Sequence, residues 1–152
     1  MQVNTEQNSL CQHKNLFPSL IEGKMNELFH QCRREFGKED LQLEETIKYG
    51  VCFFHQFLYI HPFVNGNGRV ARVLLSYLLS KFTVVPLSLY TGKKTRDICL
   101  QCLSEADNDK RFTLVAFILE NIRLTSYKIC VLMDIDFNET RVYCQIKISL
   151  FF

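Results

Sequence analysis

The chain has 152 residues, of which 47% are hydrophobic, so it can bury one core of ordinary size within a single domain. Its 18 basic and 16 acidic residues give a formal net charge of +2, which argues against a protein that binds nucleic acid through clustered positive charge. No stretch reaches the roughly 18 apolar residues of a membrane span, and the polar residues 1–12 lack the features of a secretory signal, so we expect a cytoplasmic protein without a membrane span.

Apolar residues recur every three or four positions in five stretches, and this spacing predicts a mainly α fold. Ahead of the first stretch, residues 13–19 are expected to be extended or turned, because Pro18 disfavours helix at Phe17. The predicted helices cover residues 19–37, 47–60, 69–81, 93–105 and 110–124.

The chain changes character after the last predicted helix. Large and β-branched side chains partly alternate over residues 127–152, which is typical of a short β-hairpin or of an irregular tail. The seven cysteines include a CxxC pair, Cys99 and Cys102, but no second pair stands at zinc-like spacing. We interpret them as reduced thiols packed as small hydrophobic residues.

Residues 61–72 read His-Pro-Phe-Val-Asn-Gly-Asn-Gly-Arg-Val-Ala-Arg, and they lie between two predicted helices. The first N–H groups of a helix have no intrahelical partner, and glycines let an anion approach the backbone closely. Arg69 and Arg72 are three residues apart and share a helix face, where they can hold a polyphosphate. Imidazole titrates near neutral pH, so His61 can accept the proton of an incoming hydroxyl.

Each of these features alone is usually structural: a histidine at a helix end, a glycine-rich turn, or two arginines on a solvated helix face. Their combination within twelve residues resembles the signature of the Fic family, HxFx(D/E)GNGRxxR. The resemblance covers roughly residues 13–124 and leaves out residues 1–12 and a tail, 125–152. The matching positions are His61, Phe63, Gly66, Asn67, Gly68, Arg69 and Arg72.

The resemblance implies a Fic-type helical bundle that transfers AMP from ATP to a Ser, Thr or Tyr hydroxyl of a target protein. His61 is then the general base, with Mg²⁺ or Mn²⁺ beside the phosphates. It also implies a short β-hairpin flap near the N-terminus that positions the target. The residues expected to bind the nucleotide are Gly66, Asn67, Gly68, Arg69 and Arg72, and those of the flap are Leu16, Phe17 and Pro18.

Asn65 stands where the family has Asp or Glu, the carboxylate that reaches Mg²⁺. A neutral amide oxygen can coordinate this cation but contributes no charge, so metal affinity should weaken. Three outcomes are open: slower AMP transfer, transfer from another phosphate donor, or a degenerate domain that binds a nucleotide or a partner without efficient turnover.

Two further features of the family have no clear match. The inhibitory pattern (S/T)xxxE(G/N) is incomplete at both Glu22 and Glu120. We therefore expect that inhibition is absent, comes from a separate partner, or depends on an N-terminal extension. The family often covers the adenine with a tyrosine after the motif, and Tyr90 is the possible substitute here. The identity of the base is therefore open.

Overall fold

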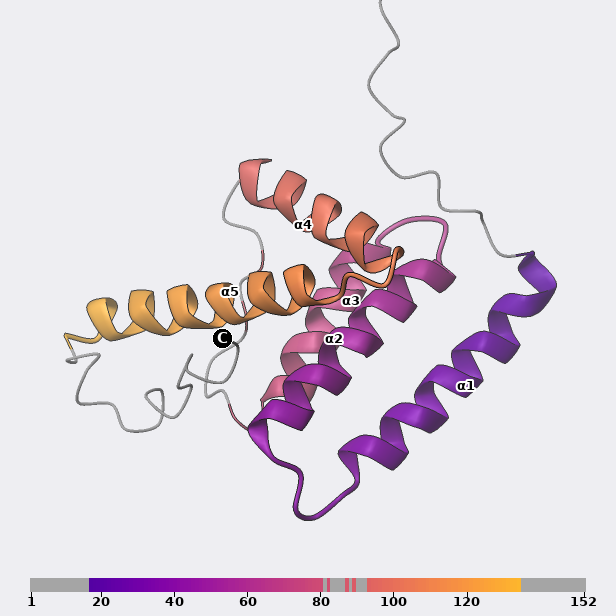
Figure 1. Ribbon diagram of the computed structural model, residues 1–152, viewed down its shortest axis with the longest axis horizontal. Helices are drawn as coiled ribbons and strands as arrows, with labels where there is room; N and C mark the ends of the chain where they lie inside the picture. Colours follow the sequence, from indigo (N-terminus) through magenta and orange to yellow (C-terminus); the bar gives the residue numbers. More distant parts are fainter. Residues whose placement is uncertain (1–16, 81, 83–86, 88, 90–92, 135–152) are drawn as a thin grey trace, which may run out of the picture.

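The computed structural model describes residues 17–80, 82, 87, 89 and 93–134. Within these residues the chain forms five helices and no strand, so the prediction of a mainly α fold is confirmed (Figure 1). None of the described helices combines the length and the apolar composition that crossing a membrane requires. The helices are α1 (Pro18–Phe36), α2 (Leu43–Ile60), α3 (Asn67–Leu79), α4 (Lys93–Ala106) and α5 (Phe112–Leu132).

Helix α1 begins where the flap was expected. Pro18 occupies the first turn of this helix, and Phe17 precedes it with a side chain that is 75% exposed. Proline fits this position because its missing N–H would have had no intrahelical partner. The prediction of a β-hairpin flap is therefore wrong for Phe17 and Pro18, and Leu16 lies outside the described residues.

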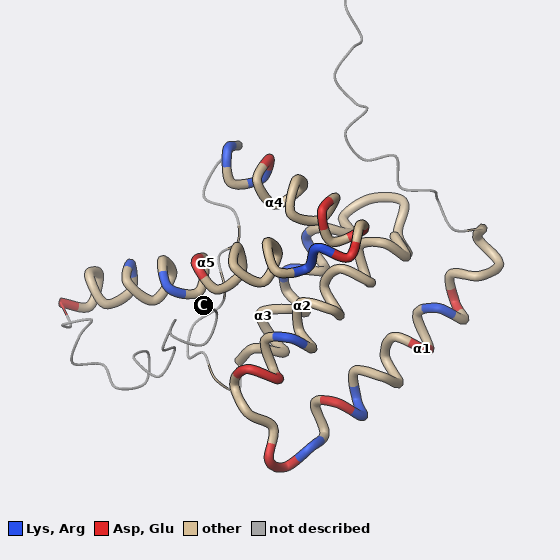
Figure 2. The backbone as a smooth tube through the Cα atoms, in the orientation of Figure 1, with Lys and Arg blue, Asp and Glu red and all other residues tan. Residues whose placement is uncertain are grey.

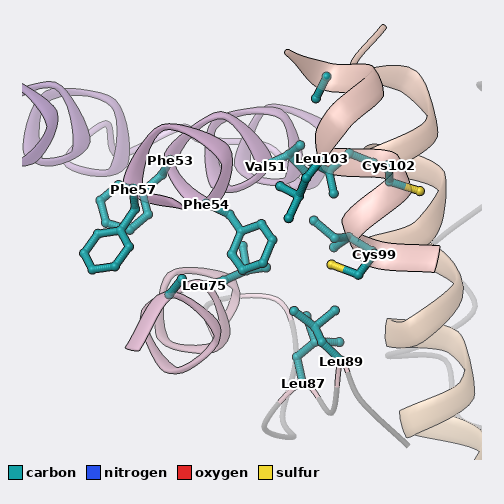
Figure 3. Packing of buried hydrophobic residues seen from close by; sticks show 14 of the residues in the cluster. Val51, Phe53, Phe54, Phe57, Leu75, Leu87, Leu89, Cys99, Cys102 and Leu103 are labelled. Atoms are coloured by element: carbon teal, nitrogen blue, oxygen red, sulfur yellow. The ribbon is translucent and has the colours of Figure 1, made fainter. Parts of the chain in front are cut away.

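Helix α2 is the centre of the bundle and packs against α1, α3 and α5, while α4 packs against α5. Its start is stabilised by a reciprocal capping box between Gln42 and Glu45. A methyl group added to Gly50 would lie 3.2 Å from Cδ1 of Leu75, so this glycine lets α2 and α3 approach closely. Figure 3 shows Phe54 of α2 beside Leu75 of α3, and both side chains are completely buried.

The two cysteines of the CxxC pair lie in the core, as predicted. Cys99 is fully buried and Cys102 is nearly so; Figure 3 shows both on α4, near Leu103. Burial raises the pKa of the Cys102 thiol, because the thiolate would lose its hydration. Both side chains therefore serve as small core residues.

Helix α5 continues to Leu132, eight residues past the end that we predicted at 124, so the prediction of β structure is wrong for residues 127–132. Tertiary packing outweighs the β propensity of these residues, because Ser126 and Cys130 are buried on one side of the helix. The hydroxyl of Thr125 also donates to the Asn121 carbonyl oxygen at 2.7 Å, which keeps a β-branched residue inside the helix. Residues 135–152 lie outside the described part.

A polar contact joins α2 to the turn after α4. Nε2 of His55 lies 2.7 Å from Oδ1 of Asp107, and the His55 side chain is only 13% exposed. We expect His55→Ala to lower the free energy of unfolding by about 1–3 kcal/mol, because it removes this contact together with a largely buried imidazole. Urea denaturation measures the change.

The control for this prediction is His30→Ala, which removes an exposed imidazole from α1. Its effect should stay within about 0.5 kcal/mol. Equal effects of the two variants would show that the link between His55 and Asp107 does not stabilise the bundle.

Candidate functional site

The motif forms the connection between α2 and α3. His61 ends α2 in the left-handed conformation, with φ 54° and ψ 57°, and its backbone N–H donates to the Phe57 carbonyl oxygen at 3.1 Å. A residue with a side chain is disfavoured in this conformation, so the turn is strained at the histidine. The strained turn leads the chain away from the buried Ile60 and leaves the imidazole exposed.

Two contacts hold the loop that follows. The ring of Phe63 lies against Phe57, with 6.3 Å between the ring centroids, and so anchors the loop to the core. The buried side chain of Asn67 binds both backbone groups of Phe63. Oδ1 accepts from the Phe63 N–H at 2.9 Å, and Nδ2 donates to the Phe63 carbonyl oxygen at 2.5 Å. By contrast, Val64 and Asn65 between them are exposed.

The loop closes through Gly66, which has a φ of +89° and accepts the first backbone hydrogen bonds of α3, from Arg69 at 2.9 Å and from Val70 at 3.0 Å. A side chain is disfavoured at this φ, so glycine is required here. The N–H groups of Asn67 and Gly68 are the first in α3 and have no intrahelical acceptor. They are available to an anion.

Each arginine lies close to a glycine, Arg69 to Gly66 in the loop and Arg72 to Gly68 in the first turn of α3. A methyl group added to Gly66 would lie 3.5 Å from Nη2 of Arg69, and one added to Gly68 would lie 3.5 Å from Nη1 of Arg72. Arg69 is exposed and forms no ion pair with any described carboxylate. The structure thus brings the six predicted residues His61, Gly66, Asn67, Gly68, Arg69 and Arg72 onto one short loop and the first turns of one helix.

This arrangement provides the parts of an anion site beside a base. Unpaired N–H groups, the positive end of the α3 dipole and two guanidinium groups all favour a negatively charged ligand. The exposed imidazole of His61 lies at the other end of the loop. A hydroxyl that approaches a bound phosphate from that side can transfer its proton to the ring.

The same residues do not fit a divalent cation held by the protein. Mg²⁺ in phosphate sites is usually bound by one or two carboxylates together with the phosphates. Residues 61–80 contain no Asp or Glu, and Asn65 offers only an amide oxygen. In the described part of the chain, no three side chains of His, Cys, Asp or Glu are grouped so that they could hold a metal.

The remaining predicted residues are not brought to this loop. The carboxylate of Glu120 pairs with Arg123, at 2.7 Å and 2.9 Å, which lowers the pKa of Glu120, and Glu22 is exposed on α1. Tyr90 lies outside the described residues. A cleft of about 250 Å³ lies between α1 and α2, beside Cys32 and Cys52, rather than at the motif.

The structure adds a structural contact that we did not predict from the sequence. The side-chain amide of Asn67 is hydrogen-bonded to the backbone of Phe63, so this side chain holds the loop in place. The backbone N–H of Asn67 lies at the N-terminal end of α3 and has no intrahelical acceptor. The sequence signal is an asparagine four residues after a phenylalanine, but only the fold shows that the two meet.

One family model and several known proteins match parts of this chain. Residues 3–79 match the sequence model described as the Fic/DOC family. The protein adenylyltransferase Fic of Drosophila melanogaster is 26% identical over 74 residues, and that of Drosophila erecta is 24% identical over the same length; each match covers 49% of this chain. The ribonucleoside-diphosphate reductase small chain of Ostreid herpesvirus 1 is 31% identical over a stretch that covers 52% of this chain.

The chain spans 15% of the length of each of these relatives. No solved structure matches the chain.

Proposed function

This chain belongs to the Fic/DOC family, and on that premise we propose that it transfers AMP from ATP to a Ser, Thr or Tyr hydroxyl of a target protein. One observation carries the proposal. His61 ends α2 beside the loop that opens α3, and the guanidinium groups of Arg69 and Arg72 lie close to glycines at the start of that helix. The names of the Drosophila relatives, which are adenylyltransferases, support the same reaction.

In the proposed reaction His61 acts as the general base. Its imidazole takes the proton of the target hydroxyl, whose oxygen attacks the α-phosphorus of ATP. The bond from the α-phosphorus to the bridging oxygen breaks, and pyrophosphate leaves. Arg69 and Arg72 hold the β- and γ-phosphates, and the N–H groups of Asn67 and Gly68 bind phosphate oxygens. Positioning and electrostatics supply most of the rate enhancement.

Three further parts of the proposal rest on the family alone. The target is a protein, inhibition is either absent or comes from a separate partner, and Mg²⁺ or Mn²⁺ accompanies ATP. Residues 61–80 contain no carboxylate, and no described group of three ligand side chains could hold a metal, so the steps above use only groups of the chain itself.

The experiment that tests the reaction compares two labelled forms of ATP. The full chain is incubated with a cell lysate and with ATP labelled on either the α- or the γ-phosphate. We expect label on protein only from the α-labelled form, because AMP transfer releases the γ-phosphate with pyrophosphate. Protein label from the γ-labelled form alone would identify phosphoryl transfer and contradict the proposal.

The alternative function is a domain that binds a nucleotide or a partner without turnover, and Asn65 is the observation that favours it. Under the proposal, Asn65→Asp should speed label transfer in Mg²⁺ about tenfold, because a carboxylate would then bind the cation beside the phosphates. Initial rates of transfer measure the effect.

The matched control for this variant is Asn26→Asp, which adds the same charge at an exposed position on α1 and should not change the rate. If ATP binds to all three proteins and none of them transfers label, the chain is the binding domain of the alternative.

A further inference from the structure

The loop and helix that form the site carry positive charge only. Residues 61–80 contain two arginines and no acidic residue. Figure 2 shows acidic positions elsewhere, at the bend between α1 and α2 and at the turn between α4 and α5. The family's own acidic position in the motif holds Asn65, whose side chain is exposed. A polyphosphate at this loop therefore meets no repulsion from the segment that binds it.

Two carboxylates from the second half of the chain already have partners. Asp107, in the turn after α4, contacts α2 through its Oδ1, which lies 2.7 Å from Nε2 of His55. On α5 the carboxylate of Glu120 is bound by Arg123 through both oxygens. Recruiting either one to a cation at the motif would break an existing contact.

Two arginine side chains, rather than a bound cation, can compensate the negative charge of the phosphates. Arg69 has no described ion-pair partner, and its guanidinium lies beside Gly66. The guanidinium of Arg72 lies in the same way beside Gly68. An arginine is always protonated and can bind a phosphate through two N–H groups, so these two side chains can do part of what a divalent cation does at a nucleotide.

We infer that this chain binds the polyphosphate of a nucleotide without needing a divalent cation. Arg69, Arg72 and the N-terminus of α3 neutralise the phosphate charge, and a cation that accompanies the nucleotide is held by the phosphates rather than by a carboxylate of the chain. The inference rests on the proposed function, since it concerns the same loop. It differs from the expectation for the family motif, in which an acidic residue reaches Mg²⁺.

Calorimetric titration of the full chain with ATP tests the inference in two buffers, one with Mg²⁺ and one with EDTA. We expect the dissociation constants for ATP in the two buffers to agree within about threefold, because the motif has no carboxylate that would bind the nucleotide through the cation. A loss of affinity greater than tenfold in EDTA would overturn the inference and leave the proposed function intact. Absence of binding in both buffers would overturn the nucleotide site itself.

Two variants separate the contribution of an arginine to ATP binding from that of the cation. Arg69→Gln should weaken ATP binding about tenfold in both buffers, because it removes a charge-assisted contact. Asn65→Asp should weaken binding about tenfold in EDTA only and recover in Mg²⁺, because the new carboxylate repels bare phosphates but binds the cation. Arg33→Gln is the control, an exposed cation near the far end of α1, and should change nothing. Equal effects of Arg69→Gln and Arg33→Gln would contradict the role of Arg69.

Discussion

Replacing His61 with alanine is expected to abolish protein labelling by α-labelled ATP while the helical fold is retained. A general base contributes about 10²–10⁴-fold to a rate, so transfer should fall by at least about 10²-fold. ATP binding should change little, because the phosphates are held by the arginines and by the start of α3. Initial rates of label transfer measure the loss, and calorimetry measures the affinity.

The fold should survive this change for a reason visible in the structure. The imidazole of His61 is exposed, and its link to α2 is the backbone hydrogen bond to Phe57, which alanine keeps. Circular dichroism and thermal unfolding check this point. His30→Ala is the control for loss of an imidazole, since His30 is exposed on α1. Undiminished labelling by His61→Ala would show that His61 is not the base.

Replacing Asn67 with alanine is expected to weaken both the loop and the nucleotide site. The variant loses two hydrogen bonds and leaves the N–H and the carbonyl group of Phe63 without their partner. The free energy of unfolding should fall by about 1–3 kcal/mol. A loop that no longer holds the phosphates in place should transfer AMP about 10²-fold more slowly, because small misplacements of reacting groups have effects of this size.

Thermal unfolding and label transfer, measured on the same preparation of the Asn67 variant, separate the two effects. Asn108→Ala is a matched control, because Nδ2 of Asn108 also donates to a carbonyl four residues earlier, at 2.9 Å, but in an exposed turn. If Asn67→Ala and Asn108→Ala have equal effects on stability and on transfer, the contact between Asn67 and Phe63 does not organise the site.

Apolar spacing in the sequence was sufficient to locate the parts of the fold that carry the site. The predicted helix over 47–60 and the predicted start near Arg69 correspond to α2 (Leu43–Ile60) and α3 (Asn67–Leu79). Helix ends next to glycine or proline are recognisable in a sequence because these residues restrict the backbone in known ways. The loop between the two helices followed from the same signals.

The two errors have physical causes that a local pattern does not resolve. Pro18 excludes helix at the preceding residue but is equally suited to the first turn of a helix, and the second effect decides the structure. The β-branched residues near the end of α5 favour strands in isolation, yet burial of Ser126 and Cys130 keeps them helical. Contacts such as Asn67 with Phe63 arise only once the loop has closed.

The most direct test of the account is an ATP titration of the ¹⁵N-labelled chain, followed by the chemical shifts of the backbone amides. We predict that the amides of Gly66, Asn67 and Gly68 shift most, together with those of Arg69 and His61, because the phosphates bind at the start of α3. Shifts confined to other helices, for example around the cleft between α1 and α2, would contradict the placement of the nucleotide on this loop.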